Sequence, residues 1–188
     1  IDYYLNKYDG YGSAEHGYSA GEGGNAQKSY DRNVSTTWTN LLSFNKEFGQ
    51  HSLGVLLGEE SFSRTVAGLS AGRKGFPFGG LYELSSAAEP DYSTSYVDNY
   101  RLLSYFSRVE YDFADKYYLS GSVRTDGSSK FSPVSRWGTF WSAGASWRIN
   151  NEEFMRNATW IDNLKLKASY GAVGNDNLSS WYCYQGLY

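Results

Sequence analysis

The sequence predicts an all-β protein, folded as an antiparallel up-and-down meander of about eight strands. Polar and apolar residues alternate over long stretches, and the connections between these stretches alternate in length. The composition agrees, with 18 Tyr, 10 Phe, 6 Trp and 21 Gly among 188 residues, since aromatic residues are enriched in strands. Successive side chains of a strand point to opposite faces, so each strand should have one apolar and one polar face.

The clearest example is the segment 117–149, which reads as a long β-hairpin. In its first half Tyr117, Leu119, Gly121 and Val123 share one face. The apolar face of its second half is made of Trp137, Thr139, Trp141, Ala143, Ala145, Trp147 and Ile149. Between the halves lies a stretch of Ser, Gly and Pro, residue types that favour turns.

Two surroundings suit such an apolar face. One is the dry interior of a soluble β-sandwich, and the other is the lipid-facing side of an outer-membrane barrel with its aromatic girdle. The connections favour the membrane, because outer-membrane barrels alternate long outside loops with short periplasmic turns. Strands of about 9–11 residues or more also suffice to cross a bilayer at a tilt. Only the connection 150–162 departs from this alternation.

The remaining elements are predicted from the same alternation. Further strands are expected at residues 1–8, 28–48, 51–63, 96–113 and 163–173, with a partial strand at 181–188. Long outside loops are expected at residues 9–27, 64–95, 127–136 and 174–180. Short turns are expected at 49–50 and 114–116, a short helix at 81–88, and a capped helical turn at 151–154.

Charge and composition exclude several classes. A net charge of −3 gives no strong attraction to nucleic acid, which is therefore not expected as a partner. The mean hydropathy is −0.56, and no apolar run approaches the roughly 20 residues of a transmembrane helix. The single Cys183 excludes an internal disulfide. The chain begins in mid-strand without Met, so we expect a piece of something larger or the loss of a leader.

Four blocks of sequence follow one another between residues 96 and 177. They are Ser104–Tyr111 with Asp115–Leu119, Ser122–Phe131 with Arg136–Gly138, Gly144–Ile149 with Glu153–Met155, and Asn163–Gly171 with Gly174–Asp176. In this order and spacing they resemble the barrel of the SusC/RagA family of TonB-dependent outer-membrane transporters. Residues 38–60 match more loosely and the first 27 hardly at all. Phe140-Trp141-Ser142 departs from the expected Phe-Pro-Ser.

The resemblance implies a large barrel of about 22 strands around an N-terminal plug, of which this chain would be an interior segment without the plug. It implies import of glycan fragments or peptides across the bacterial outer membrane, with a SusD-like surface lipoprotein as partner. The TonB complex would supply energy through an N-terminal part that the chain lacks. Outer-membrane lipid and an oligosaccharide or peptide cargo complete the expected partners. Two alternatives stay open, a soluble or surface-exposed carbohydrate-binding module and a complete small outer-membrane barrel.

Candidate binding residues lie on the polar face and in the longest predicted loop. Arg108, Arg124 and Asp126 could line the lumen, although pairing within the wall is the simpler interpretation and Asp126 could also begin a turn. The aromatic side chains of the predicted loop could stack on sugars or anchor the loop, and they are Phe76, Phe78, Tyr82 and Tyr92.

Residues that could perform chemistry are sparse. His16 and His51 have no third ligand at metal-site spacing, so no metal is expected. Glu59 and Glu60 would point to opposite faces of a strand, and Glu152 and Glu153 read as helix-capping residues. A membrane-embedded hydrolase would need a Ser/His/Asp or similar cluster on a lumen face, which two His outside the clear strands do not favour. We therefore expect no enzyme activity and no cofactor.

Overall fold

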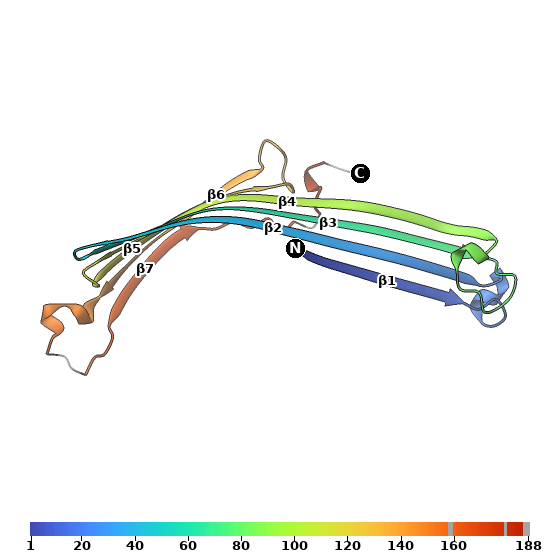
Figure 1. Cartoon of the computed structure of the whole chain (residues 1–188), viewed down its shortest axis with the longest axis horizontal. Coiled ribbons are helices and arrows are strands. Elements are labelled where there is room, and N and C mark those ends of the chain that lie inside the picture. The colour runs from blue at the N-terminus through green and yellow to red at the C-terminus, as the bar shows by residue number, and fades with distance from the viewer. Residues whose placement is uncertain (158–159, 179, 186–188) are drawn as a thin grey trace. The chain divides into compact units, whose positions relative to one another are not determined.

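The computed structural model describes residues 1–157, 160–178 and 180–185. Within them seven strands form one open sheet in the order β1 to β7, each strand lying between its neighbours in sequence (Figure 1). The strands are β1 (Asp2–Gly12), β2 (Asn25–Phe48), β3 (His51–Lys74), β4 (Glu89–Phe113), β5 (Tyr117–Ser128), β6 (Trp137–Arg148) and β7 (Lys165–Ala172). The antiparallel meander is thus confirmed, with seven strands among the described residues rather than about eight.

The predicted faces of the central hairpin are confirmed by the register. Opposite residues of antiparallel strands lie on the same face. Tyr117 pairs with Trp147 and Val123 with Trp141, so the apolar residues of β5 and β6 share one face. The same register carries the apolar face across β4 and β7, where Val109 pairs with Gly121 and Tyr170 with Ala143.

The predicted loop 64–95 is wrong over most of its length. Strand β3 continues to Lys74 and β4 begins at Glu89, so both exceed 20 residues and only residues 75–88 connect them. These strand ends are rich in Gly and polar residues, and their apolar alternation is therefore weak. Two of the other loops are also shorter than predicted, because β1 and β2 leave residues 13–24 between them and β5 and β6 leave 129–136. After β7 the irregular segment begins at residue 173.

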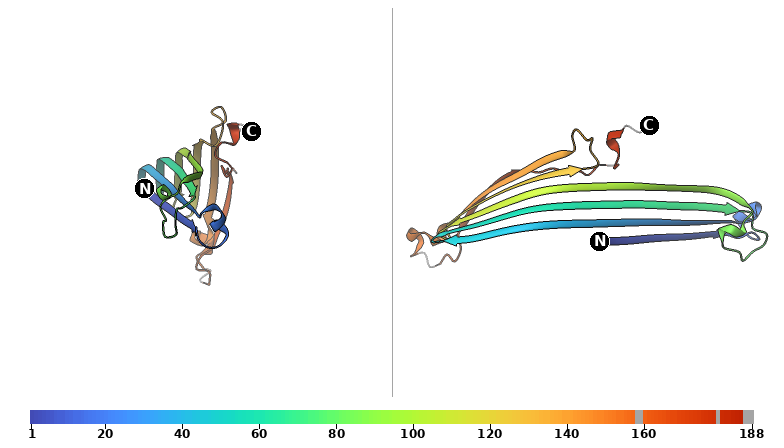
Figure 2. Two further views of the ribbon diagram at one scale, coloured as in Figure 1. Left: turned by 90° about the vertical axis from the view of Figure 1, so that its right-hand side faces the viewer. Right: turned by 45° about the horizontal axis from the view of Figure 1, so that its top comes forward.

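The chain divides into two compact units, residues 1–36 with 63–100 and residues 37–62 with 101–188. In the first unit the β1–β2 and β3–β4 connections lie side by side at the strand ends (Figure 2). The amides of Gly75 and Phe76 donate to the carbonyls of Gly24 and Gly23 at 3.1 and 2.7 Å. Between these connections lies the small buried cluster of Ala26, Phe76 and Ala87.

In the second unit the two short hairpin turns and the β6–β7 connection gather at one end of the strands (Figure 2). The β2–β3 turn is Gly49-Gln50 and the β4–β5 turn is residues 114–116, both as predicted. The Ala114 amide donates to the Gln50 carbonyl at 2.6 Å, and the Arg148 amide donates to the Lys116 carbonyl at 2.7 Å. Backbone hydrogen bonds therefore link the turns directly.

The helical segments are all short 3₁₀ turns: η1 (Tyr18–Glu22), η2 (Leu84–Ser86), η3 (Ile149–Asn151), η4 (Glu153–Met155) and η5 (Cys183–Gln185). The predicted helix at 81–88 is reduced to η2. The partial strand predicted at 181–188 is replaced by η5 over its described part, while residues 186–188 lie outside the described residues. The capped turn at 151–154 has no side-chain cap, because Glu152 binds elsewhere.

Candidate functional site

The apolar face of the second unit is open. Tyr105 is 49% exposed, Trp141 45% and Tyr170 77%, although all three lie on regular strands. Buried hydrophobic residues among those described are limited to Ala26, Phe76 and Ala87, which belong to the loop cluster of the first unit. A soluble sandwich would bury such a face against a second sheet, and the described residues supply none. The face is built for an apolar surrounding that lies outside this chain.

A row of aromatic rings, which we call the aromatic row, crosses this face beside the short turns. Phe48 stacks on His51 at 5.1 Å between ring centroids, and His51 lies 4.8 Å from Phe113. The row continues from Phe113 to Tyr117 at 6.3 Å and from Tyr117 to Trp147 at 6.4 Å. Phe154 of the β6–β7 connection meets Trp147 edge-on at 6.5 Å. Rings of this kind gather where a barrel wall passes from hydrocarbon to water.

The opposite face is polar and internally paired. The Arg124 Nε donates to Asp126 Oδ1 at 2.7 Å, and its Nη2 donates to Ser104 Oγ at 2.9 Å. The same nitrogen lies 3.4 Å from Glu60 Oε1, and the guanidinium stands over the Phe106 ring at 5.5 Å. Arg124 thus joins β5 to β4 and β3. Asp126 pairs with Gly138 inside the β5–β6 ladder, so the suggestion that it begins a turn is wrong.

Further cations follow the same face. Arg108 forms an ion pair with Glu110 two residues along β4. Lys165 places its Nζ 3.6 Å from the centroid of the Tyr118 ring, and Arg148 faces that ring at 5.3 Å. An open hollow of about 600 Å³ is lined by Glu110, Asp112, Lys165, Lys167 and neighbouring small residues. The polar face therefore combines ion pairs with two lysines that line an open hollow.

The four aromatic candidates take different places. Phe76 is 5% exposed and packs in the loop cluster, so it anchors the β3–β4 connection. Tyr82 contacts Tyr11 at 4.8 Å and is 60% exposed, while Phe78 is 61% exposed. Tyr92 belongs to β4 rather than to a loop, and its hydroxyl donates to Gln27 Oε1 at 3.1 Å. Phe78 and Tyr82 are the two that present open ring faces.

Sequence reasoning missed a set of aromatic–glycine pairs between β3 and β4. A Cβ at Gly58 would lie 2.2 Å from the Phe106 ring, one at Gly68 would lie 2.2 Å from Tyr96, and one at Gly72 would lie 2.5 Å from Tyr92. The glycine intervals repeat those of the aromatic residues in reverse order, as antiparallel pairing requires. This matched spacing is the signal that would have extended both strands through the predicted loop.

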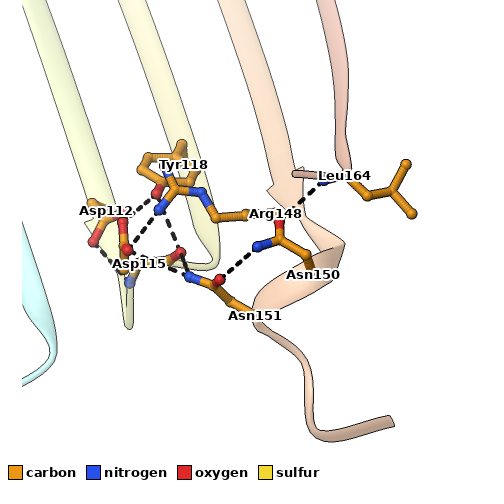
Figure 3. A network of polar contacts seen from close by, with 7 residues as sticks. All are labelled: Asp112, Asp115, Tyr118, Arg148, Asn150, Asn151 and Leu164. Carbon is orange, nitrogen blue, oxygen red and sulfur yellow. Dashed lines mark hydrogen bonds and ion pairs between the residues drawn. The ribbon is translucent and has the colours of Figure 1, made fainter. Parts of the chain in front are cut away.

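A polar network closes the short-turn end of β4, β5 and β6 (Figure 3). Arg148 Nη1 lies 2.6 Å from Asp115 Oδ2, and Asn151 Nδ2 donates to the Asp115 carbonyl at 3.0 Å. Asp112 Oδ1 accepts from the Asp115 amide at 3.1 Å. The hydrogen bond from Tyr118, followed by the charge of Arg148, holds the pKa of Asp115 below its ordinary value despite the opposing effect of burial.

Glu152, which lies in the β6–β7 connection, is the centre of a second polar network at this end. Its carboxylate accepts hydrogen bonds from the Tyr117 hydroxyl at 2.6 Å, the Lys116 Nζ at 2.9 Å and the Trp147 indole nitrogen at 3.0 Å. The Tyr117 bond, then those from Lys116 and Trp147, lower the pKa of Glu152 to about 2. Glu152 does stand at the N-cap position of η4, and Glu153 lies in its first turn, as predicted. The Glu152 carboxylate makes no capping hydrogen bond, however, because three donors from β5, β6 and the turn occupy it.

The described residues offer little for metal or nucleophilic chemistry. Across residues 1–157, 160–178 and 180–185, no three His, Cys, Asp or Glu side chains cluster as a metal site would require. His51 instead pairs its Nδ1 with the Tyr111 hydroxyl at 2.6 Å within the aromatic row. The geometry of the polar face is that of a wall lined with paired charges.

Comparison with known proteins supports the same conclusion. The chain is 35% identical over 164 residues to TonB-dependent receptor P3 of Formosa agariphila, a match that covers 86% of this chain and 16% of the receptor. It is 37% identical over 95 residues to TonB-dependent receptor SusC of Bacteroides thetaiotaomicron, covering 50% of this chain and 10% of SusC. The solved RagAB peptide transporter superposes with a TM-score of 0.81 at 32% identity, covering 87% of this chain and 18% of that one. No family model matches the chain.

An antiparallel sheet with one open apolar face, one charged face and an aromatic row at the strand ends is the wall of an outer-membrane β-barrel. The chain corresponds to a segment of the barrel of TonB-dependent transporters of the SusC/RagA type. It spans less than a fifth of the length of the relatives it matches.

Proposed function

We propose that this chain forms part of the wall of an outer-membrane importer that takes up glycan fragments or peptides by energy-coupled transport. The observation that carries the proposal is the shared barrel segment, which has 32% identity and a TM-score of 0.81 to the RagAB peptide transporter. In this role the apolar face meets lipid and the polar face lines the passage. The wall would guide cargo without chemical change, so no enzymatic activity is expected.

The partners follow from the same relatives. A TonB complex would supply energy, because the sequence relatives are TonB-dependent receptors. A SusD-like surface lipoprotein would cover the outside end, as the resemblance to SusC implies. The β3–β4 connection of the first unit carries the exposed rings of Phe78 and Tyr82. These two side chains are our candidates for contacts with a partner or with arriving cargo.

Arg108, Arg124 and Asp126 are the candidate cargo contacts on the polar face. Arg124 is held on several sides by Asp126, Ser104 and Glu60, and the two carboxylates compensate its charge, so it is largely engaged within the wall. Arg108 is more exposed, with 57% of its side chain open, and it forms an ion pair with Glu110 on the same strand. An anionic glycan or a peptide carboxylate would find Arg108 more available than Arg124.

Uptake by cells that carry the complete transporter tests this proposal. Fluorescent peptide and oligosaccharide libraries would be offered to the parent and to an Arg108→Ala variant, with Ser122→Ala on the same face as the matched control. We expect energy-dependent uptake by the parent, a several-fold loss for anionic cargo in Arg108→Ala, and no change in the control. Absence of uptake for both cargo classes, with surface expression intact, would contradict the importer assignment.

A further inference from the structure

The β6–β7 connection, residues 149–164, is unusually long for a short-turn end and is partly folded. It contains η3 and η4, and the backbone amide of Ile149 donates to the Leu164 carbonyl at 2.8 Å, which brings the two ends of the connection together. Asn150 Oδ1 accepts from the Leu164 amide at 3.2 Å, also visible in Figure 3. The part of the connection at residues 149–157, which carries both 3₁₀ turns, therefore has a defined surface.

That surface is tied to the aromatic row. Glu152 accepts hydrogen bonds from Tyr117 and Trp147, the two strand residues of the row nearest the connection. These bonds satisfy the polar atoms of both rings, so their apolar parts remain on the open face. Immediately after Glu152, Phe154 contacts Trp147 edge-on at 6.5 Å yet stays 68% exposed. Phe154 therefore extends the row from the strands onto the connection.

We infer that the β6–β7 connection is an interfacial anchor that rests on the phospholipid headgroup layer at the short-turn side of the membrane, with Phe154 inserted among the headgroups. The inference rests on continuity, because the strand part of the row already occupies the level at which a barrel wall leaves hydrocarbon. Large exposed aromatic side chains favour this interface over water. Trp160, 82% exposed in the same connection, is a second candidate contact.

Charge identifies the kind of lipid surface. Glu152 is paired with Lys116, and the rest of the connection carries Glu153 and Asp162 against the single cation Arg156, so it remains net acidic. An acidic segment gains nothing from anionic headgroups, and attachment through aromatic rings is insensitive to salt. The expected surface is therefore a zwitterionic headgroup layer. A polybasic patch would instead bind anionic headgroups, and its attachment would weaken as the salt concentration rises.

Spin labels in the complete barrel, reconstituted in phosphatidylcholine vesicles with Cys183→Ser, test the inference. Labels at Phe154→Cys and at the adjacent, exposed Glu153→Cys form the matched pair, and Leu119→Cys on the apolar face of β5 gives the hydrocarbon reference. Collision with oxygen, which concentrates in lipid, is compared with collision with a water-soluble nickel chelate. We expect the ratio of oxygen collisions to nickel-chelate collisions at position 154 to lie between the ratios at positions 153 and 119. This ratio should be the same at low and at high salt.

Equal ratios at 153 and 154 would overturn the inference. If the label at 154 prevents folding, judged by heat-modifiable migration, Phe154→Trp provides a second measurement that preserves a ring. The tryptophan fluorescence that this variant shows beyond the parent should be quenched by phosphatidylcholine brominated near the headgroup. If the additional fluorescence is not quenched, the inference is overturned as well. A barrel that imports cargo normally while residue 154 lies in water would leave the proposed function standing, so the two failures are distinguishable.

Discussion

The hydroxyl of Tyr117 donates a hydrogen bond to Oε1 of Glu152 at 2.6 Å, joining the first residue of β5 to the β6–β7 connection. The same carboxylate accepts from Lys116 and Trp147, so one side chain links the β4–β5 turn, two strands and a loop. Glu152 therefore ties together the elements that meet at the short-turn end.

Stability of the barrel should depend on pH through Glu152. Its pKa is lowered to about 2 in the folded state from an ordinary value of 4.5, so the folded state binds this proton more weakly than the unfolded state does. The stabilisation is therefore fully present above pH 4.5 and is lost as the pH falls toward 2. Urea unfolding in vesicles across this window should show the loss in the parent.

The Glu152→Gln variant removes this titration. It should be less stable than the parent at neutral pH and should show a flatter pH dependence between pH 4.5 and 2. Glu153→Gln is the matched control, since Glu153 is exposed and lies next to Glu152. A pH dependence that survives unchanged in Glu152→Gln would assign the effect to other carboxylates.

Ala114→Gly should stabilise the β4–β5 turn. Ala114 and Asp115 both have φ near 56°, a conformation that costs a residue with a Cβ about 1–2 kcal/mol. Glycine removes that cost at the expense of greater freedom in the unfolded chain, for a net gain of about 0.5–1 kcal/mol. Urea unfolding measures it. Asp115→Gly is the contrasting variant, because the same relief comes with loss of the contacts to Arg148 and Asn151, and it should be destabilising.

Gly58→Ala should displace the Phe106 ring. The new Cβ would lie 2.2 Å from ring carbons, and the ring must swing toward the open polar face, at a cost of about 1–2 kcal/mol. Combining it with Phe106→Ala forms a double-mutant cycle. We expect Gly58→Ala to cost clearly less without the ring, and strictly additive effects would show that ring and glycine do not interact.

Arginine should be tolerated on one face of β5 and not on the other. Val123→Arg places a charge on the apolar face, where barrel residues within the bilayer lose about 2–4 kcal/mol at the midplane and less near the interfaces. Ser120→Arg, on the polar face of the same strand and opposite Glu110 in the β4–β5 register, should cost little. The comparison is made by reversible unfolding from vesicles, and equal costs would show that the apolar face does not meet lipid.

Local chemistry decided the strands around residues 100–173. Alternation of Tyr, Trp, Val and Leu with Ser, Arg and Lys has period two, and this determines which side chains share a face whatever the register. The sequence also predicted the short turns and the shared face of Tyr117, Trp141 and Trp147. Turn residues and alternation act within a few positions of the chain, so both can be recognised locally. The same stretch carried the resemblance that the relatives support.

Tertiary contacts decided the rest. Residues 64–74 and 89–95 became strand because Tyr92 and Tyr96 cover Gly72 and Gly68 across the β3–β4 ladder, and a pairing between residues so distant in sequence leaves no local periodicity. Glu152 keeps its predicted place at the N-cap of η4 but makes no capping hydrogen bond, because Lys116 and Tyr117, which are distant in sequence, converge on its carboxylate together with Trp147. Tertiary contacts also decided between the alternatives that the sequence left open, and they made Phe76 a buried anchor and Arg124 an ion-pair residue. Alternation specifies the two faces of each strand, but the partner of a side chain is set only when the strands pair.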